Sequence, residues 1–387
     1  MNVIVLSHLR WDFVYQRPQH LLSRCAQSNP VWFIEEPVFD AQQQREASAR
    51  LEISRRPGGV TVCVPHLPAG ISERDSRRLQ GELLKGLIDE HCMIDYVLWY
   101  YTPMAWEFTR DLSPKAVVYD CMDELSAFRG APPGLRAAEA ELLQRADVVF
   151  TGGRTLYEAK KHQHPNIHPF PSSIDRAHFA QARIIAAEPT DQANIPHPRL
   201  GFAGVIDERM DTALLGRVAA LRPNWHFVMI GPVVKISDAD LPQAANIHYL
   251  GGRDYQCLPA YMSGWDIGIL PFALNESTRY ISPTKTPEYL AAGLPVISTA
   301  ITDVVHPYGD SGLVKIAGNA QDLIGAAESM LAPQYDAKND TERLRLVDEF
   351  LSRSSWDSTW QRMWALIQEV TDAQRSELSR CETAQSA

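Results

Sequence analysis

Lys285 and Glu288 are the residues of this sequence best placed to do chemistry, because they lie three positions apart at the predicted start of a short helix. Pro287 is tolerated only in a first helical turn, which makes Thr284 the predicted N-cap. A helix start offers unpaired N–H groups to an anion, and Lys285 adds a full positive charge. Glu288 has two oxygens that can accept hydrogen bonds from adjacent hydroxyls, as on a ribose. The pair therefore predicts a site for a diphosphate and a ribose.

Each of these residues alone also has an ordinary structural explanation. A Glu near a helix start often serves the helix dipole, and an exposed Lys is often solvated surface. The surroundings favour a binding site, because an apolar strand pattern at 267–270 leads into a loop of hydroxyl and amide residues and then into the helix. From this loop we expect further donor-site residues, namely Asn275, Thr278, Ser282 and Thr284.

Small residues follow predicted strands in the second half of the chain. Gly204 comes directly after one strand and precedes Arg209, and a backbone without a side chain can approach a phosphate closely. Gly231 and Gly251 follow two further strands and are expected to form walls of the nucleotide pocket. For Arg209 a surface ion pair with a neighbouring acid is the equal alternative.

Acidic side chains follow the predicted strand at 116–119. Asp120, Asp123 and Glu124 repel one another, which favours a raised pKa on one of them. Such a carboxylate can act as the general base for an acceptor hydroxyl. Asp120 and Asp123 are the better candidates and Asp12 is the next, while helix capping and solvation explain each residue equally well.

Alternating strands and helices must position these residues. Apolar runs alternate with amphipathic runs in both halves of the chain, which predicts α/β domains with parallel sheets covered by helices. The pattern breaks between 170 and 198, where prolines cluster. We therefore predict doubly wound domains at 1–185 and 186–355, with strand ends facing a ligand cleft. A helix and tail at 356–387, with three tryptophans on one face, are expected to cross back to the first domain.

Length and composition exclude several classes of protein. A chain of 387 residues exceeds one hydrophobic core, and 45% hydrophobic with 22% charged residues is typical of globular proteins. The net charge of -10 argues against sequence-independent binding to nucleic acid. The six cysteines lack metal-ligand spacing, so neither a disulfide framework nor a metal site is expected. Without a signal peptide or a spanning run of about 20 apolar residues, we expect a cytoplasmic protein and leave peripheral membrane contact open.

The segment around Lys285 resembles the donor-binding signature of GT-B glycosyltransferases. The resemblance is to glycosyltransferase family 4 and to bacterial polysaccharide transferases of the teichuronic-acid, TuaH-like kind. The matching residues are Pro283, Lys285, Glu288, Tyr289, Ala291, Gly293, Pro295 and Val296, with Asn275 and Thr278 before them. The resemblance implies two Rossmann-like domains facing a cleft, a diphosphate on Lys285 and Arg209, a ribose on Glu288, and no cofactor besides the nucleoside-diphosphate sugar.

Two further features concern this resemblance. Many relatives carry a second Glu eight residues before the position of Glu288, where it contacts the donor sugar. Tyr280 stands there in this chain, so the motif does not define the donor sugar or the stereochemistry of transfer. Similar transferases also share the sequence motif at residues 16–20. This motif predicts that Arg17 and His20 lie near the interdomain cleft.

The sequence thus predicts a glycosyltransferase of the hexosyltransferase type (EC 2.4) for bacterial surface or exopolysaccharide synthesis. The donor would bind mainly to the second domain, and a glycan or lipid-linked acceptor mainly to the first. Arg209 and Lys285 would stabilise the charge that develops on the leaving diphosphate. Two alternatives stay open. One is a nucleotide-sugar epimerase, which would isomerise the donor alone, and the other is an inactive nucleotide- or glycan-binding partner in a synthesis complex.

Overall fold

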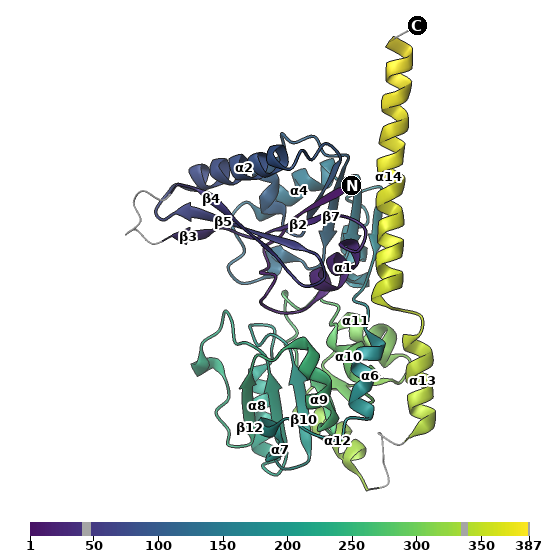
Figure 1. Ribbon diagram of the computed structural model, residues 1–387. Coiled ribbons are helices and arrows are strands. Elements are labelled where there is room, and N and C mark those ends of the chain that lie inside the picture. The colour runs from purple at the N-terminus through teal and green to yellow at the C-terminus, as the bar shows by residue number, and fades with distance from the viewer. Residues whose placement is uncertain (41–47, 334–339, 386–387) are drawn as a thin grey trace.

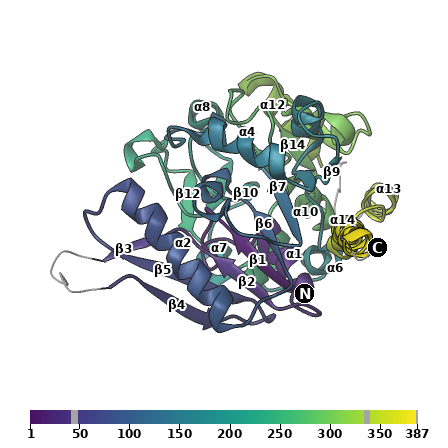
Figure 2. The same ribbon diagram turned by 90° about the horizontal axis from the view of Figure 1, so that it is seen from above.

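The computed structural model describes residues 1–40, 48–333 and 340–385 as two α/β domains, one above the other in Figure 1. Each domain is built on a wholly or mainly parallel sheet with helices on both faces, which confirms the predicted fold class. A long helix, α14 (Trp356–Gln385), runs along the side of the upper, N-terminal domain. Seen from above in Figure 2, α14 points toward the viewer at one side of the molecule.

The N-terminal sheet has the strand order β3-β5-β2-β1-β6-β7-β8-β9, with β4 paired antiparallel to β5 and all other pairs parallel. The strands are β1 (Asn2–Leu6), β2 (Val31–Ile34), β3 (Val38–Asp40), β4 (Arg50–Arg55), β5 (Thr61–Pro68), β6 (Tyr96–Tyr100), β7 (Ala116–Cys121), β8 (Val148–Thr151) and β9 (Ile167–Pro169). The helices are α1 (Arg17–Cys25), α2 (Glu73–Glu90), η1 (Pro103–Ala105), α3 (Trp106–Thr109), η2 (Leu125–Ala127), α4 (Leu135–Arg145) and α5 (Arg154–Lys160).

Both faces of this sheet are covered, which explains why its central strands read as continuous apolar runs. Along β1, Ile4 and Leu6 face a core cluster that includes residues of α2, α3 and α4. Val3 and Val5 face the opposite cluster, to which α1 and α14 contribute. The alternation follows from the two-residue period of a strand.

The C-terminal sheet is wholly parallel, in the order β12-β11-β10-β13-β14-β15. Its strands are β10 (Arg199–Ala203), β11 (His226–Ile230), β12 (Ile247–Gly251), β13 (Ile267–Leu270), β14 (Val296–Ser298) and β15 (Val314–Ile316). The helices around it are α6 (Arg176–Ala180), η3 (Gln181–Arg183), α7 (Thr190–Ala193), α8 (Thr212–Leu221), η4 (Asp238–Asp240), η5 (Tyr255–Cys257), α9 (Leu258–Ser263), α10 (Lys285–Ala291), α11 (Thr302–Val304), η6 (Val305–Gly309), α12 (Ala320–Leu331) and α13 (Thr341–Leu351).

The domain boundary lies earlier than the predicted division at 185/186. Ile174, Phe179 and Ala182 are buried in the core cluster of the C-terminal domain, together with residues of α9 and α10. Phe170, by contrast, belongs to the core of the N-terminal domain. The chain therefore changes domain at about 171–173, because α6 and η3 pack on the second domain although they precede its first strand.

Helix α14 lies on the N-terminal domain through its first turns. Trp356, Met363 and Ile367 are buried in that domain's core, and Trp360 stacks on Trp99 with ring centroids 6.3 Å apart. Fully burying an apolar side chain of this size contributes about 1.5–3 kcal/mol. The end of the chain thus ties the second domain back to the first.

Specific contacts also fix the two domains against each other. Asp303 of the C-terminal domain accepts hydrogen bonds from the backbone N–H groups of Arg154 (2.9 Å) and Thr155 (3.0 Å), at the start of α5. Ser172 donates a hydrogen bond to the carbonyl of Ser282 at 3.0 Å. These contacts hold a cleft between the carboxyl ends of the two sheets. Within the described part of the chain, no helix combines the length and apolar character needed to cross a membrane.

Candidate functional site

Two neighbouring cavities lie between the domains. The larger has a volume of about 440 Å³ and is lined by the segment 11–15 of the first domain and by loops that follow β10, β11 and β12 of the second. The smaller, of about 140 Å³, reaches toward the ends of β7 and β8. Both cavities are lined by Val14, Tyr15, Gly204 and Lys285. They therefore form one interdomain cleft with Lys285 at its centre.

Lys285 lines this cleft, and Glu288 lies beside it on α10, outside the lining of both cavities. The Lys285 ammonium donates a hydrogen bond to Glu288 Oε2 at 2.7 Å, and the two side chains are 16% and 7% exposed. Burial raises the pKa of the Glu288 carboxyl, and the positive charge of Lys285 opposes that shift. The second oxygen, Oε1, has no donor among the residues that the structure describes. The pair thus offers one cation and one free carboxylate oxygen.

Helix α10 is held in place by Tyr289. Its hydroxyl accepts a hydrogen bond from the backbone N–H of Ala203 at 2.7 Å, at the end of β10. This bond places Lys285 beside Gly204. Thr284 occupies the N-cap position, but its side chain makes no capping hydrogen bond. Thr284 and Ser282 both line the smaller cavity, where their hydroxyls can face a ligand.

The predicted glycines form a close-packed backbone wall. Gly231 has φ of +147°, and a Cβ there would lie only 1.8 Å from the carbonyl oxygen of Gly204. Gly204 and Gly231 both line the larger cavity. Gly251 does not line it, and instead its carbonyl accepts a hydrogen bond from Gly231 N at 2.9 Å. Its neighbour Gly252 is the lining residue.

Arg209 lies in the smaller cavity together with Lys285. Asp207 accepts hydrogen bonds from Arg209 Nε at 2.9 Å and from Nη2 at 2.7 Å. The remaining nitrogen, Nη1, has no acceptor in the described part of the chain. The guanidinium also lies 5.4 Å from the ring centroid of Phe128, which belongs to the other domain. The alternative of a surface ion pair with a neighbouring acid thus takes the form of a partly buried pair with Asp207.

The structure separates the two carboxylates that sequence alone could not distinguish. Asp120 is fully buried, and Arg17 donates to it from Nη2 at 2.8 Å and from Nε at 3.0 Å. Asp120 lines neither interdomain cavity and is already paired with Arg17, so its assignment as a general base stays a prediction that this geometry does not favour. Asp123 lines the smaller cavity opposite Arg209. Burial raises its pKa to about 6, while the charges of Arg209 and Arg17 oppose the shift.

Other predicted residues shape the site without lining it. Asn275 accepts hydrogen bonds from Ser277 and from the backbone N–H of Thr278, and Thr278 is buried and bonded within the same loop. Neither residue lines the interdomain cavities, and their contact with the donor stays a prediction. Arg17 touches the smaller cavity but is committed to Asp120. His20 is buried against Trp356, with stacked rings 4.6 Å apart.

Tyr280 and Asp12, which the sequence placed near the donor or the acceptor, make contacts with other parts of the protein. Tyr280, at the place of the relatives' first Glu, packs against the core cluster of the N-terminal domain. Asp12 lines the larger cavity, 62% exposed, and forms an ion pair with Arg56 at 2.8 Å. Tyr280 thus contributes to the contact between the domains.

Sequence reasoning missed an aromatic pair across the cleft. Tyr15 of the first domain stacks on Tyr255 of the second, with ring centroids 4.5 Å apart, and both line the larger cavity. The Tyr255 hydroxyl is buried and has no hydrogen-bond partner within the described residues. The only sequence signal was the position of Tyr255 shortly after β12, in a loop predicted to face the nucleotide.

Metal-ligand clusters are not part of this cleft. Among residues 1–40, 48–333 and 340–385, no group of three or more His, Cys, Asp or Glu side chains is arranged to hold a metal. Asp238 and Asp240 stand two residues apart in the exposed turn η4, where Asp240 caps the backbone N–H of Ser237 at 2.9 Å. That pair lines neither interdomain cavity.

Comparison with known proteins agrees with this geometry. Residues 197–332 match the family model described as glycosyl transferases group 1. Among solved structures, the chain is similar to sucrose-phosphate synthase from Thermosynechococcus elongatus, with a TM-score of 0.73, 14% identity and coverage of 96% and 99% of the two chains. It is also similar to an α,α-trehalose-phosphate synthase from Burkholderia xenovorans, with a TM-score of 0.67, 12% identity and coverage of 94% and 99%. These likenesses show the fold.

The chain thus has the fold of GT-B glycosyltransferases and matches a glycosyltransferase model over residues 197–332, which agrees with the expectation from the motif around Lys285. Within that class it is similar to the putative teichuronic acid biosynthesis glycosyltransferase TuaH of Bacillus subtilis (strain 168), with 26% identity over 262 residues. The alignment spans 62% of this chain and 64% of the length of TuaH.

Proposed function

We propose that this protein transfers a sugar from a nucleoside-diphosphate sugar to a glycan or lipid-linked acceptor in bacterial polysaccharide synthesis. The observation that carries the proposal is Lys285 in the lining of both interdomain cavities, held by a hydrogen bond to Glu288, whose second carboxylate oxygen has no donor among the described residues. The match to group 1 glycosyltransferases and the similarity to TuaH support the same reaction.

The charge balance of the cleft suits a diphosphate. Lys285 and Arg209 are each neutralised by one carboxylate, and neither cation would remain buried without such a partner. A diphosphate that enters the cleft can take hydrogen bonds from the Lys285 ammonium and from Arg209 Nη1, while Asp207 keeps Arg209 in position. These preorganised cations would stabilise the charge that develops as the diphosphate leaves. The donor is a substrate, and the reaction as proposed requires no further cofactor.

Asp123 is the candidate base for the acceptor. Its carboxyl lies in the same small cavity as Arg209 and Lys285, and its pKa of about 6 lets it accept a proton near neutral pH. An acceptor hydroxyl in this cavity would lose its proton to Asp123 as it attacks the donor sugar. We further propose a cytoplasmic location, from which a lipid-linked acceptor would bring the protein to the inner face of the membrane as a peripheral enzyme.

A thermal-shift screen with nucleoside diphosphates and nucleotide sugars tests the donor site. A ligand at about 100 times its Kd stabilises the native state by about 2.7 kcal/mol. For a domain of this size that raises Tm by roughly 5–10 °C. Lys285→Ala is expected to abolish most of the shift, whereas Lys315→Ala, which removes an exposed lysine on β15, is expected to keep it. If no nucleotide raises the Tm of the native protein, or if Lys285→Ala responds like it, the proposal fails.

A further inference from the structure

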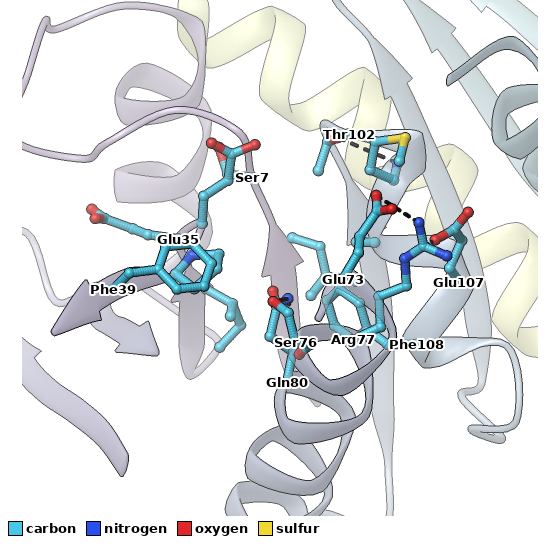
Figure 3. Close-up of a pocket in the computed structure, with 16 residues that line it drawn as sticks. Ser7, Glu35, Phe39, Glu73, Ser76, Arg77, Gln80, Thr102, Glu107 and Phe108 are labelled. Carbon is cyan, nitrogen blue, oxygen red and sulfur yellow. Dashed lines mark hydrogen bonds and ion pairs between the residues drawn. The ribbon is translucent and has the colours of Figure 1, made fainter. Parts of the chain in front are cut away.

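A third cavity, of about 300 Å³, lies within the N-terminal domain and is drawn in Figure 3. It opens at the carboxyl ends of β1, β2 and β6 and is walled by the first turns of α2 and by α3. None of its lining residues lines either interdomain cavity. Ligands of open α/β sheets bind at this edge, so the position of the cavity suits a binding site.

The cavity has an excess of negative charge. Its lining residues include Glu35, Glu36, Glu73 and Glu107, and the one cation among them is Arg77. Arg77 is already bound by two carboxylates, Glu73 at 2.7 Å and Glu107 at 2.5 Å. Figure 3 shows Arg77 between these two residues. Arg77 is therefore already neutralised and offers no free positive charge to an anionic ligand.

Of the two remaining carboxylates, only Glu36 adds to this negative charge, because Glu35 is paired with Arg10. Glu35 is bound by Arg10 Nη1 at 2.8 Å and by the backbone N–H of Trp11 at 2.8 Å. Glu36 has no ion-pair partner among the residues that the structure describes, and it faces the same cavity. A phosphate or carboxylate placed here would be repelled by Glu36 without a free cation in compensation.

Buried hydroxyls and aromatic rings give the cavity the other features of a sugar site. Ser7, Thr102 and Ser76 are 3%, 7% and 9% exposed, and each oxygen accepts a hydrogen bond from a nearby N–H group. None of the three has an acceptor for its own hydroxyl proton in the described part of the chain, so each can donate to a ligand. Phe39, 51% exposed, and Phe108 add apolar faces. Such a mixture of donors, acceptors and flat apolar surface fits a sugar ring.

The cavity is linked to the donor cleft by one segment. Glu35 accepts a hydrogen bond from the backbone of Trp11, and Trp11 lines the larger interdomain cavity. Segment 7–15 therefore has Ser7 in the third cavity and Tyr15 in the donor cleft. A chain of sugars can follow this segment, with the reacting unit in the cleft and another unit in the third cavity.

We propose that this cavity binds a sugar unit of the acceptor that carries neither phosphate nor carboxylate, and that it rejects anionic units. The inference rests on the proposed glycosyltransferase function and deepens it, since it defines the chemical class of acceptor that this chain uses beyond the reacting unit.

Binding of three small probes to the full-length protein tests this inference. The probes are the methyl glycoside of glucose, the methyl glycoside of glucuronic acid, and glucose 6-phosphate, followed through the amide NMR signals of Ser76, Arg77 and Gln80. The neutral glycoside is expected to move these signals and to bind at least about tenfold more tightly than either anion, because like charges about 6 Å apart at an intermediate dielectric repel by that factor.

Charge-reversal variants separate the electrostatic cause from other effects. Glu36→Lys is expected to reduce the preference to less than about threefold, since it replaces the uncompensated anion by a cation. Glu90→Lys, at the exposed end of α2 outside the cavity, makes the same charge change and is expected to keep the preference. An anion that binds as tightly as the neutral glycoside, or a neutral glycoside that leaves the cavity signals unmoved, overturns the inference.

The same samples distinguish this inference from the proposed function. A nucleoside-diphosphate thermal shift without any effect of the neutral probe on the cavity would refute the inference and leave the enzyme assignment intact. Probe binding at the cavity without any nucleotide binding would refute the donor site, and the cavity would then be that of a glycan-binding protein.

Discussion

Asp123→Asn tests the assignment of the base most directly. Asparagine keeps the size of the side chain but cannot take up a proton, and Asp123 lies in the cavity that also contains Arg209 and Lys285. Loss of a general base typically lowers the rate by about 10²–10⁴-fold. The assay is release of nucleoside diphosphate from the donor that the thermal-shift screen identifies, in the presence of acceptor.

The pH profile gives a second, independent readout. Burial raises the pKa of Asp123 to about 6, so kcat/KM of the native protein is expected to rise as the pH increases through about 6 and then to level off. The residual activity of Asp123→Asn is expected to lack this acidic limb. Asp89→Asn, on the exposed end of α2 away from the cleft, is the control and is expected to keep both the rate and the acidic limb of the pH profile.

Stability should change in the opposite direction to activity. A folded-state pKa of about 6, against 3.8 as the ordinary value, means that ionisation of Asp123 costs the folded protein about 3 kcal/mol, at 1.36 kcal/mol per pKa unit. This cost is absent below about pH 4, grows between about 4 and 6, and is complete above that. Asp123→Asn is therefore expected to be more stable than the native protein at pH 7–8, by up to about 3 kcal/mol in urea unfolding, and equally stable near pH 4. Full activity in Asp123→Asn, or an unchanged acidic limb, would refute the reasoning.

Four further changes probe the rest of the architecture. Glu288→Gln is expected to weaken binding of nucleoside diphosphates relative to pyrophosphate by about tenfold, because the ribose loses a charged acceptor, whereas Lys285 only loses its neutralising carboxylate; calorimetry with both ligands measures this. Gly231→Ala is expected to abolish the nucleotide thermal shift, since its Cβ would collide with the backbone of Gly204. Arg17→Ala is expected to lower the free energy of unfolding by about 3–5 kcal/mol, because it leaves Asp120 buried and unpaired. Met363→Ala is expected to lower it by about 2–5 kcal/mol, because it opens a cavity under α14. Equal urea midpoints for either variant and the native protein would contradict the last two expectations.

The binding loop illustrates how far local sequence reasoning reaches. Pro287 and the residue spacing around it located the start of α10, because helix starts are governed by interactions within one turn. The same reasoning assigned Asn275 and Thr278 to the donor, whereas both satisfy hydrogen bonds within their own loop. Polar residues near a site have two uses, ligand contact and loop closure, and only their partners in space distinguish them.

The amino-acid sequence by itself determined the alternation of strands and helices, the two-domain α/β class, and the proximity of Lys285 to Glu288, since periodicity and helix capping act over a few residues. The tertiary structure alone decided that Asp120 is sealed against Arg17 while Asp123 faces the cleft. It also decided that α6 belongs to the second domain and that Tyr15 meets Tyr255 across the cleft. The burial of a side chain and its contacts with distant segments depend on how whole helices and strands pack. A short stretch of sequence does not determine that packing.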